Sequence, residues 1–328
     1  MSNSSQPQQS PPRWSVLQKG WVKIRARWAR LPGNVRGGLF ILTAALFFAL
    51  MVALIKLAGT SLHVMEVLFF RQLAMIIIAS PMILRSFPSS LTSRRPGLQI
   101  LRVATAFVAM TLGFTAVINL PLAEATTIAF GKTFFTTILA IFVLGEIVGP
   151  RRWGAVIVGF LGVLVVAWPT EGTAFNIYGL MAIGSAALVG VVMVSVRLLS
   201  LVDEPITILS YQAIGVGLLM LPGTIWFWQT PTMAELGLLF GIGALAVCGQ
   251  YINILGLRAG EASAVAPLDY SRLVYTLFLG WWIFSEWPEP RVFIGAAIIV
   301  AAAAYTLHRE RVVGKAKQAK RARTIVSD

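Results

Sequence analysis

The stretch Ala123-Glu124-Ala125-Thr126-Thr127-Ile128-Ala129 returns 137 positions later as Gly260-Glu261-Ala262-Ser263-Ala264-Val265-Ala266. Two further pairs of short segments recur in the same order and at nearly the same shift: Gly145-Glu146 with Ser285-Glu286, and Gly154-Ala155 with Gly295-Ala296. Ordered matches of this kind indicate an internal repeat. We therefore predict that the chain consists of two copies of one unit.

The sequence around these segments is arranged in long apolar runs. Hydrophobic residues make up 57% of the 328 positions and charged residues only 12%, whereas a typical soluble domain is about 25% charged. A helix that crosses a bilayer needs about 20 apolar residues. Ten apolar runs are candidates for such helices: Gly37–Leu57, Val64–Leu84, Leu98–Ile118, Leu122–Leu144, Trp153–Trp168, Ile177–Leu199, Ile206–Trp228, Leu236–Leu257, Ser263–Phe284 and Val292–Leu307.

Each copy of the repeat contains five of these runs, and because five is odd the second copy enters the membrane in the opposite orientation. We predict an all-α integral membrane protein of ten transmembrane helices, arranged as two inverted five-helix repeats. This architecture is typical of alternating-access transporters. The predicted boundaries are a disordered basic tail at residues 1–35, a first repeat at 36–170, a second repeat at 171–308 and a basic tail at 309–328.

The positive charge of the chain predicts its orientation. The formal net charge is +14, and twenty-two of the 27 Lys and Arg residues lie in the tails or near alternate connections. Only Lys56 and Arg291 lie in the other connections. Because cytoplasmic segments of membrane proteins carry this excess of positive residues, we place both termini in the cytoplasm. The same distribution favours membrane topology, and no nucleic acid, as the reason for the basic charge.

Four charged side chains inside the predicted spans are candidates for substrate binding. An ionisable group within a membrane is costly unless it faces a partner or water, so Arg71, Lys132, Asp269 and Arg272 mark a polar region. The repeat aligns Lys132 with Asp269, and both lie near the middle of their spans. Asp269 and Arg272 share a helix face, and Asp269 is the candidate for proton coupling because burial and nearby charges shift a carboxyl pKa. Structural ion pairs are the alternative.

Uncharged polar residues near these helix faces complete the substrate-binding candidates: Thr136, Tyr211, Gln250, Asn253 and Tyr275. Gln250 and Asn253 share a face of the eighth span, and Tyr211 precedes Gln212 in the seventh. Buried amides in membranes often only bridge helices, so a structural role stays open for them. Glu286, at the end of the ninth span, is instead expected to be held by neighbouring basic groups or helix ends.

Sequence motifs of catalysis are absent from the chain. It contains no GxSxG, no HExxH and no acidic DxxxD pair, which argues against an enzyme. It also contains no Walker loop, which argues against an ATP-driven pump. One cysteine, Cys248, and two distant histidines, His63 and His308, do not form a metal-binding cluster. We expect no cofactor and no metal.

Several short motifs occur at matching places in the ten predicted spans: Glu66 with Phe69-Phe70-Arg71, Leu144-Gly145-Glu146 followed by Arg152-Trp153-Gly154, and Ala262-Ser263 with Ser285-Glu286 in the second half. Together they resemble the motifs of EamA-type permeases in the drug/metabolite transporter superfamily. Arg94-Arg95-Pro96-Gly97 with Leu101-Arg102 is similar to the subgroup of riboflavin and S-adenosylmethionine uptake carriers. The chain departs from the family at Lys132-Thr133, where relatives often have a proline.

The resemblance and the charged spans together predict a secondary transporter in the bacterial inner membrane. Its substrate would be a small polar organic metabolite, either amino-acid-like or a heterocyclic vitamin-like or nucleoside-like compound, carried by alternating access. Two alternatives stay open: a carrier specific for riboflavin or S-adenosylmethionine, and a membrane scaffold or receptor that transports nothing. The expected partners are the lipid bilayer and the substrate. The sequence leaves open whether protons take part and whether the chain forms a homodimer.

Overall fold

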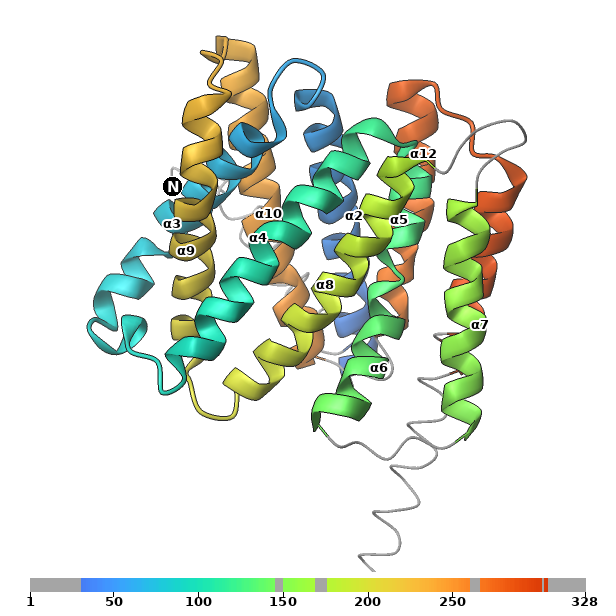
Figure 1. Cartoon of the computed structure of the whole chain (residues 1–328), viewed down its shortest axis with the longest axis horizontal. Coiled ribbons are helices and arrows are strands. Elements are labelled where there is room, and N and C mark those ends of the chain that lie inside the picture. The colour runs from blue at the N-terminus through green and yellow to red at the C-terminus, as the bar shows by residue number, and fades with distance from the viewer. Residues whose placement is uncertain (1–30, 145–149, 169–175, 260–265, 303, 306–328) are drawn as a thin grey trace, which may run out of the picture.

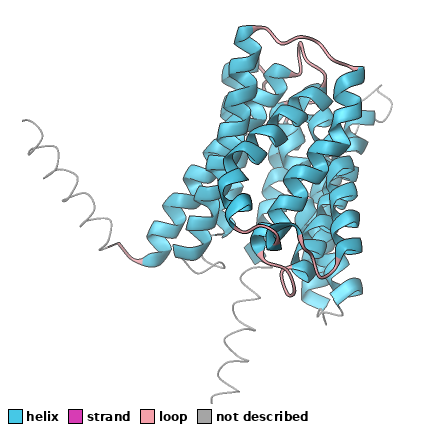
Figure 2. Ribbon diagram, turned by 90° about the vertical axis from the view of Figure 1, so that its left-hand side faces the viewer, coloured by secondary structure: helices cyan, strands magenta, loops and turns pink. Residues whose placement is uncertain are grey.

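A computed structural model describes residues 31–144, 150–168, 176–259, 266–302 and 304–305 of the chain. Every regular element within these ranges is a helix, and Figure 2 shows no strand among them. This confirms the predicted all-α fold. Most of the predicted N-terminal and C-terminal tails, and residues 260–265 of the second copy of the repeated motif, lie outside the described residues.

The first half contains the first five predicted spans: α2 (Gly33–Ala58), α3 (Val64–Arg85), α4 (Pro96–Asn119), α5 (Leu122–Ala129) with α6 (Lys132–Leu144), and α7 (Pro150–Ala167). The second half contains α8 (Ile177–Leu199), α9 (Pro205–Trp226), α10 (Met233–Ala259), η2 (Ala266–Tyr270) with α12 (Ser271–Phe284), and a last helix Pro290–Ala302. Seven described segments, α5–α6 counted as one, are long and apolar enough to cross a membrane, and two more are shorter apolar helices. With η2–α12, the ten predicted spans are present in order.

The helices of one half pack against helices of the other half in a symmetric way. The most extensive pairs are α2 with α10 and α4 with α8, followed by α3 with α9. Exchange of the two repeats turns the pair α2–α10 into the pair α8–α4 and maps the pair α3–α9 onto itself. The exchange also maps the fourth span onto the ninth, and these two spans are in contact through α5 and α12. This packing is what a pseudo-two-fold axis in the membrane plane requires.

The fifth and tenth spans lie together at one edge of the bundle (Figure 1). They approach closely because glycines face the neighbouring helix. A Cβ added at Gly162 of α7 would lie 2.9 Å from Ile298, and one added at Gly295 would lie 2.2 Å from Val166 and 2.7 Å from the carbonyl oxygen of Gly162. Small residues at such contacts are the usual means of packing transmembrane helices.

Two spans are interrupted near their middle. The fourth span is broken at Phe130-Gly131, between α5 and α6. A Cβ at Gly131 would lie 2.9 Å from the carbonyl oxygen of Ile128 and 3.0 Å from Val163, so the tight break leaves no room for a side chain. The ninth span changes at Tyr270 from the 3-10 helix η2 to the α-helix α12. Local 3-10 geometry and discontinuous helices are common at functional sites of transporters.

Candidate functional site

A cavity of about 320 Å³ lies at the centre of the bundle, between helices of both repeats. Its volume is within the range of small-molecule sites. Small side chains on α4, α5 and α8 make the space: Ala106, Ala109, Gly113, Ala125, Ala129, Ala182 and Ala186. Larger apolar side chains, including Met51, Met110 and Phe114, complete the wall. The cavity can therefore enclose the apolar part of a small ligand.

Three positively charged side chains line this cavity: Arg71 of α3, Lys132 of α6 and Arg272 of α12. Among the described residues that line it, none is an aspartate or a glutamate. Asp269 lies beside the cavity lining and forms an ion pair with Arg272, with 3.4 Å between Oδ2 and Nη2. Within the described part of the chain, Arg71 and Lys132 form no ion pair.

The two broken spans bring Lys132 and Arg272 to one aromatic ring. The Nζ atom of Lys132 lies 5.6 Å from the centre of the Phe130 ring, and the guanidinium carbon of Arg272 lies 4.8 Å from it. Phe130 also packs against Tyr270 in a tilted arrangement, with 4.8 Å between ring centres. Since Phe130 belongs to the break in the fourth span and Tyr270 ends η2, the two breaks meet at this pair of rings. The repeat architecture thereby places one cation from each half beside the cavity.

Among the described residues, Arg71 has a neutral hydrogen-bond partner, its sequence neighbour Gln72. Its Nη1 atom donates to the side-chain oxygen of Gln72 at 2.8 Å, and its Nε atom is buried without a hydrogen-bond partner. Gln72 is fully buried and donates to the backbone oxygen of Gln212 at 3.2 Å. The side-chain oxygen of Gln212 in turn accepts a hydrogen bond from Arg102. A chain of amides thus fixes two guanidinium groups between α3, α4 and α9 without neutralising either charge.

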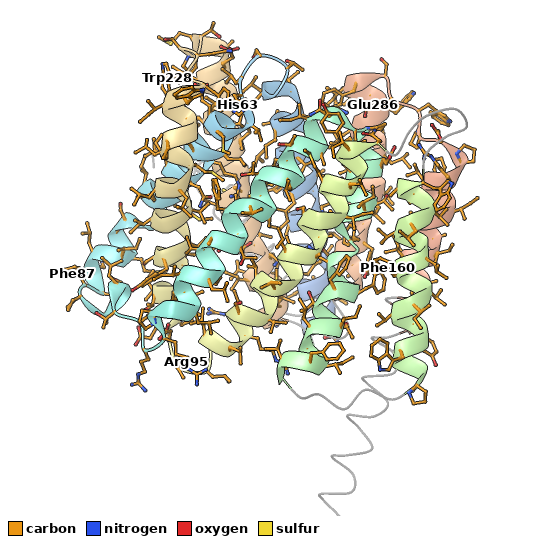
Figure 3. The ribbon with its side chains drawn as sticks, in the orientation of Figure 1. His63, Phe87, Arg95, Phe160, Trp228 and Glu286 are labelled. Carbon is orange, nitrogen blue, oxygen red and sulfur yellow. The ribbon has the colours of Figure 1, made fainter. Side chains whose placement is uncertain are left out.

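A second cluster of charges lies at one end of the bundle, and here the cations are paired. Lys56 donates to the carboxylate of Glu286 and, at 2.6 Å, to the backbone oxygen of Leu120. The other carboxylate oxygen of Glu286 accepts from the backbone N–H of Leu122 at 2.8 Å. Glu286 is therefore held by a basic group and a helix end, as predicted. Figure 3 shows Glu286 at the same end of the bundle as His63 and Trp228, opposite Arg95.

The local backbone aims Glu286 at this position. Ser285 adopts a left-handed conformation, with φ 56°, directly after α12. The N–H of Glu286 then donates back to the carbonyl of Gly280 at 3.0 Å, so the chain folds back over the end of α12. Arg291 extends the cluster through ion pairs to Glu289 at 2.6 Å and to Glu124 at 3.8 Å. The cluster ties the first, fourth and ninth spans to the last helix.

The profile of the EamA-like transporter family matches residues 35–168 and again residues 176–307. The chain belongs to the EamA-like transporter family. The two matches of one family profile are the two copies of the repeat, and the ten-span fold of two inverted repeats is the fold of this EamA-like protein. The members of the family are transporters and not enzymes. The protein is therefore a multi-pass membrane transporter, whose surroundings are the lipid bilayer and whose ligand is a small molecule.

Curated relatives of this EamA-like transporter are named for different cargoes. The S-adenosylmethionine uptake transporter of Rickettsia bellii is 31% identical over 259 residues, which cover 78% of this chain and 88% of that protein. The riboflavin transporter of Vibrio cholerae is 28% identical over 280 residues, covering 83% and 92%. The pseudopaline exporter of Pseudomonas aeruginosa is 26% identical over 268 residues, covering 81% and 94%. These names include transport in both directions, so neither cargo nor direction follows from similarity alone.

The structure brings together some of the predicted site residues and leaves others apart. Arg71, Lys132 and Arg272 line the cavity of the EamA-like bundle, and Asp269 adjoins it through Arg272. The other five candidates do not line it: Thr136, Tyr211, Gln250, Asn253 and Tyr275. The hydroxyl of Thr136 donates to the backbone of Lys132 at 2.7 Å, and that of Tyr211 to Leu91 at 3.1 Å. A substrate contact of these five stays a prediction.

Three uncharged polar residues line the cavity without having been among the substrate-binding candidates: Gln212, Ser185 and Thr126. The hydroxyl of Thr126 is buried and has no hydrogen-bond partner, whereas that of Ser185 donates to the backbone of Ala109 at 2.7 Å. Thr126 could have been found from the sequence, because it lies in the repeated motif. Ser185 lies in a run of small residues typical of helix packing and gives no such signal.

Proposed function

We propose that this protein is a secondary carrier of the bacterial inner membrane, which moves a small polar organic metabolite by alternating access, with both termini in the cytoplasm. One observation carries the proposal: a cavity lined by three half-buried cations lies where the broken spans of the two repeats meet. Broken helices that surround a polar site near the membrane midplane are characteristic of such carriers. A scaffold would need no polar cavity, so the same observation speaks against that alternative.

The substrate is amino-acid-like, or a heterocyclic vitamin-like or nucleoside-like compound. Arg71, Lys132 and Arg272 supply the charged contacts, and Gln212 and Thr126 offer hydrogen bonds from two other helices. Riboflavin and S-adenosylmethionine are the first compounds to test, because relatives are named for them. Both are small enough to be enclosed in part by a cavity of this class.

Asp269 has two proposed roles in this carrier. It positions Arg272 through their ion pair, and it is the candidate group for proton coupling. Its side chain is 33% exposed, which leaves a path for proton exchange. A carrier that exchanges one substrate for another without protons would need Asp269 only as a positioning residue. The pH dependence of transport in Asp269→Asn distinguishes the two roles.

Alternating access requires contacts that open in turn at the two ends of the cavity. At the predicted outer end, the cluster of Lys56, Glu286 and Arg291 joins the first, fourth, ninth and tenth spans. At the predicted inner end, Asp203 accepts hydrogen bonds from Ser93, from the N–H of Arg94 and from Gln99. We assign these two sets of contacts as the sites where the bundle separates during transport.

Reconstitution of the purified full-length chain in proteoliposomes tests the proposal. A thermal-shift screen with amino acids, nucleosides, riboflavin and S-adenosylmethionine first identifies a ligand, and counterflow of that labelled ligand then measures transport. We expect Lys132→Ala and Asp269→Asn to abolish transport while the protein still purifies as a monodisperse species. Arg85→Ala is the control, because Arg85 is an exposed cation at the end of α3, away from the cavity. Wild-type rates in both cavity variants would contradict the site assignment.

A further inference from the structure

We infer that the substrate of this carrier is an organic anion, with a carboxylate or phosphate group held between Lys132 and Arg272 and a net negative charge when bound. The inference rests on the proposed function and names the substrate class of the same cavity. It depends on the charge balance of the cavity wall, which differs from the balance expected for a zwitterion or a cation.

The first step is the count of charges around the cavity. Three cations line the cavity. Among the described residues, Asp269 is the carboxylate that forms an ion pair with one of them, Arg272. Asp269 also acts electrostatically on Lys132, so among the described residues one carboxylate is shared by two of the three cations and Arg71 has none. A buried charge without a partner is strongly unfavourable in a protein and more so in a membrane. An anion in the cavity would supply the missing charge.

The second step is that the neutral contacts do not replace a counter-ion. Phe130 offers its ring face to both Lys132 and Arg272, and Phe48 lies 5.7 Å from the guanidinium carbon of Arg272. Cation–π contacts stabilise a cation but leave its charge in place. Lys132 begins α6 and Arg272 lies in the first turn of α12, so both cations are held at the breaks of their spans.

The third step concerns the hydrogen bonds that a ligand would complete. Arg71 uses its Nη1 atom for Gln72 and Arg272 uses its Nη2 atom for Asp269, so among the described residues each guanidinium that lines the cavity keeps its other Nη group for a ligand. A guanidinium presents its N–H donors in a fork that matches the two oxygens of a carboxylate or the oxygens of a phosphate. Unused donors on two arginines therefore favour an oxyanion over an amine or a neutral ring. The apolar wall formed by Met51, Met110 and Phe114 would hold the rest of the molecule.

Two matched pairs of compounds test the inference on the full-length protein. Riboflavin 5′-phosphate differs from riboflavin by a phosphate, and S-adenosylhomocysteine differs from S-adenosylmethionine by loss of the methyl group that makes the sulfur positive. Thermal shift and calorimetry measure the affinity for each compound. We expect the more negative member of each pair to bind about tenfold more tightly than the other.

Cavity variants show whether the preference comes from the assigned groups. Lys132→Gln should weaken binding of the more negative member by about tenfold and leave its partner within about twofold. Arg71→Gln is the second variant, in case the first does not fold, and Arg85→Gln is the exposed control expected to keep the wild-type preference. A preference that survives in both cavity variants overturns the assignment of the anion to this site.

The outcomes separate this inference from the proposed function. Tighter binding of the less negative member in either pair, or no binding of any of the four compounds, overturns the proposal that the substrate is an organic anion. If proteoliposomes still carry riboflavin or S-adenosylmethionine in the first case, the carrier function stands and only the substrate class is wrong. If no compound in the wider screen is bound or transported, both fail.

Discussion

The cavity and the outer charge cluster both contain basic side chains, but the two regions differ in how many of these side chains are paired with a carboxylate. In the outer cluster, Lys56 meets Glu286, and Arg291 meets Glu289 and Glu124. In the cavity, Arg71 and Lys132 form no ion pair with a carboxylate among the described residues. Lys56 and Glu124 of the outer cluster are buried, whereas Arg71 and Lys132 are half-buried beside the cavity.

The difference shows how the fold separates stability from function. Removing one partner of a buried ion pair is strongly destabilising, because the other charge is left without compensation. A cation that already lacks a partner instead lowers the stability of the fold. Destabilising features of this kind are typical of functional sites. Charge removal should therefore lower stability in the outer cluster and raise it in the cavity. Five single substitutions examine this contrast.

The largest effect is expected from Glu286→Gln in the outer cluster. The substitution leaves the buried amine of Lys56 without its anion, so we expect a loss of about 3 kcal/mol in the free energy of unfolding. Denaturant unfolding in detergent measures it. The double variant Lys56→Met with Glu286→Gln should recover most of the loss, because it removes both charges. Equal stability of the single variant and the wild type would show that the pair contributes nothing.

The next effect concerns Asp203, a hydrogen-bonded carboxylate in the loop between α8 and α9. Burial acts to raise the pKa of this carboxyl, but hydrogen bonds from Ser93, the N–H of Arg94 and Gln99 outweigh it, so the pKa is lower than usual. A lowered folded-state pKa means that the ionised form stabilises the fold at neutral pH. We expect Asp203→Asn to lose about 2 kcal/mol at pH 7.

The pH dependence of that loss is the sharper measurement. The stabilisation is complete above the pKa of an unfolded aspartate, about 3.9, and disappears as the pH falls through the lower folded-state pKa. Wild type and Asp203→Asn should therefore differ in unfolding midpoint at pH 7 and converge progressively as the pH falls below about 4. A difference that stays constant over this range would exclude ionisation of Asp203 as its source.

Lys132→Gln is expected to stabilise the protein, whereas Glu286→Gln and Asp203→Asn are expected to destabilise it. Because Lys132 forms no ion pair with a carboxylate among the described residues, loss of its charge should raise the free energy of unfolding by about 1 kcal/mol, even as transport is lost. Thermal unfolding and counterflow on the same preparation check both expectations. A clear loss of stability would mean that Lys132 is structural, and the contrast between the cavity and the outer cluster would disappear.

Ten spans, two repeats and the charges at the breaks could be predicted because each is a property of the chain taken in order. Apolar runs identify spans, and the aligned positions of Lys132 and Asp269 mark the middle of the fourth and ninth. Which face of a helix meets the cavity could not be predicted in this way. A transmembrane helix is apolar on all sides, so periodicity does not distinguish lipid from interior. Gln250, which is exposed, and Gln212, which lines the cavity, therefore look alike in sequence.

Tyr211 and Gln212 are adjacent on α9 but point in different directions, so they allow a comparison of a structural and a cavity-lining side chain at one place in the fold. The hydroxyl of Tyr211 donates to the backbone oxygen of Leu91 at 3.1 Å, in the loop before α4, while Gln212 lines the cavity. We expect Tyr211→Phe to cost about 0.5 kcal/mol, because it removes one hydrogen bond from a partly exposed group. Its transport rate should stay within about twofold of the wild type, whereas Gln212→Ala should lower transport by about tenfold. Counterflow rates, normalised to reconstituted protein, decide between them. If Tyr211→Phe loses transport and Gln212→Ala keeps it, the tyrosine binds substrate in a conformation other than this one, and the cavity wall changes on the side of α9.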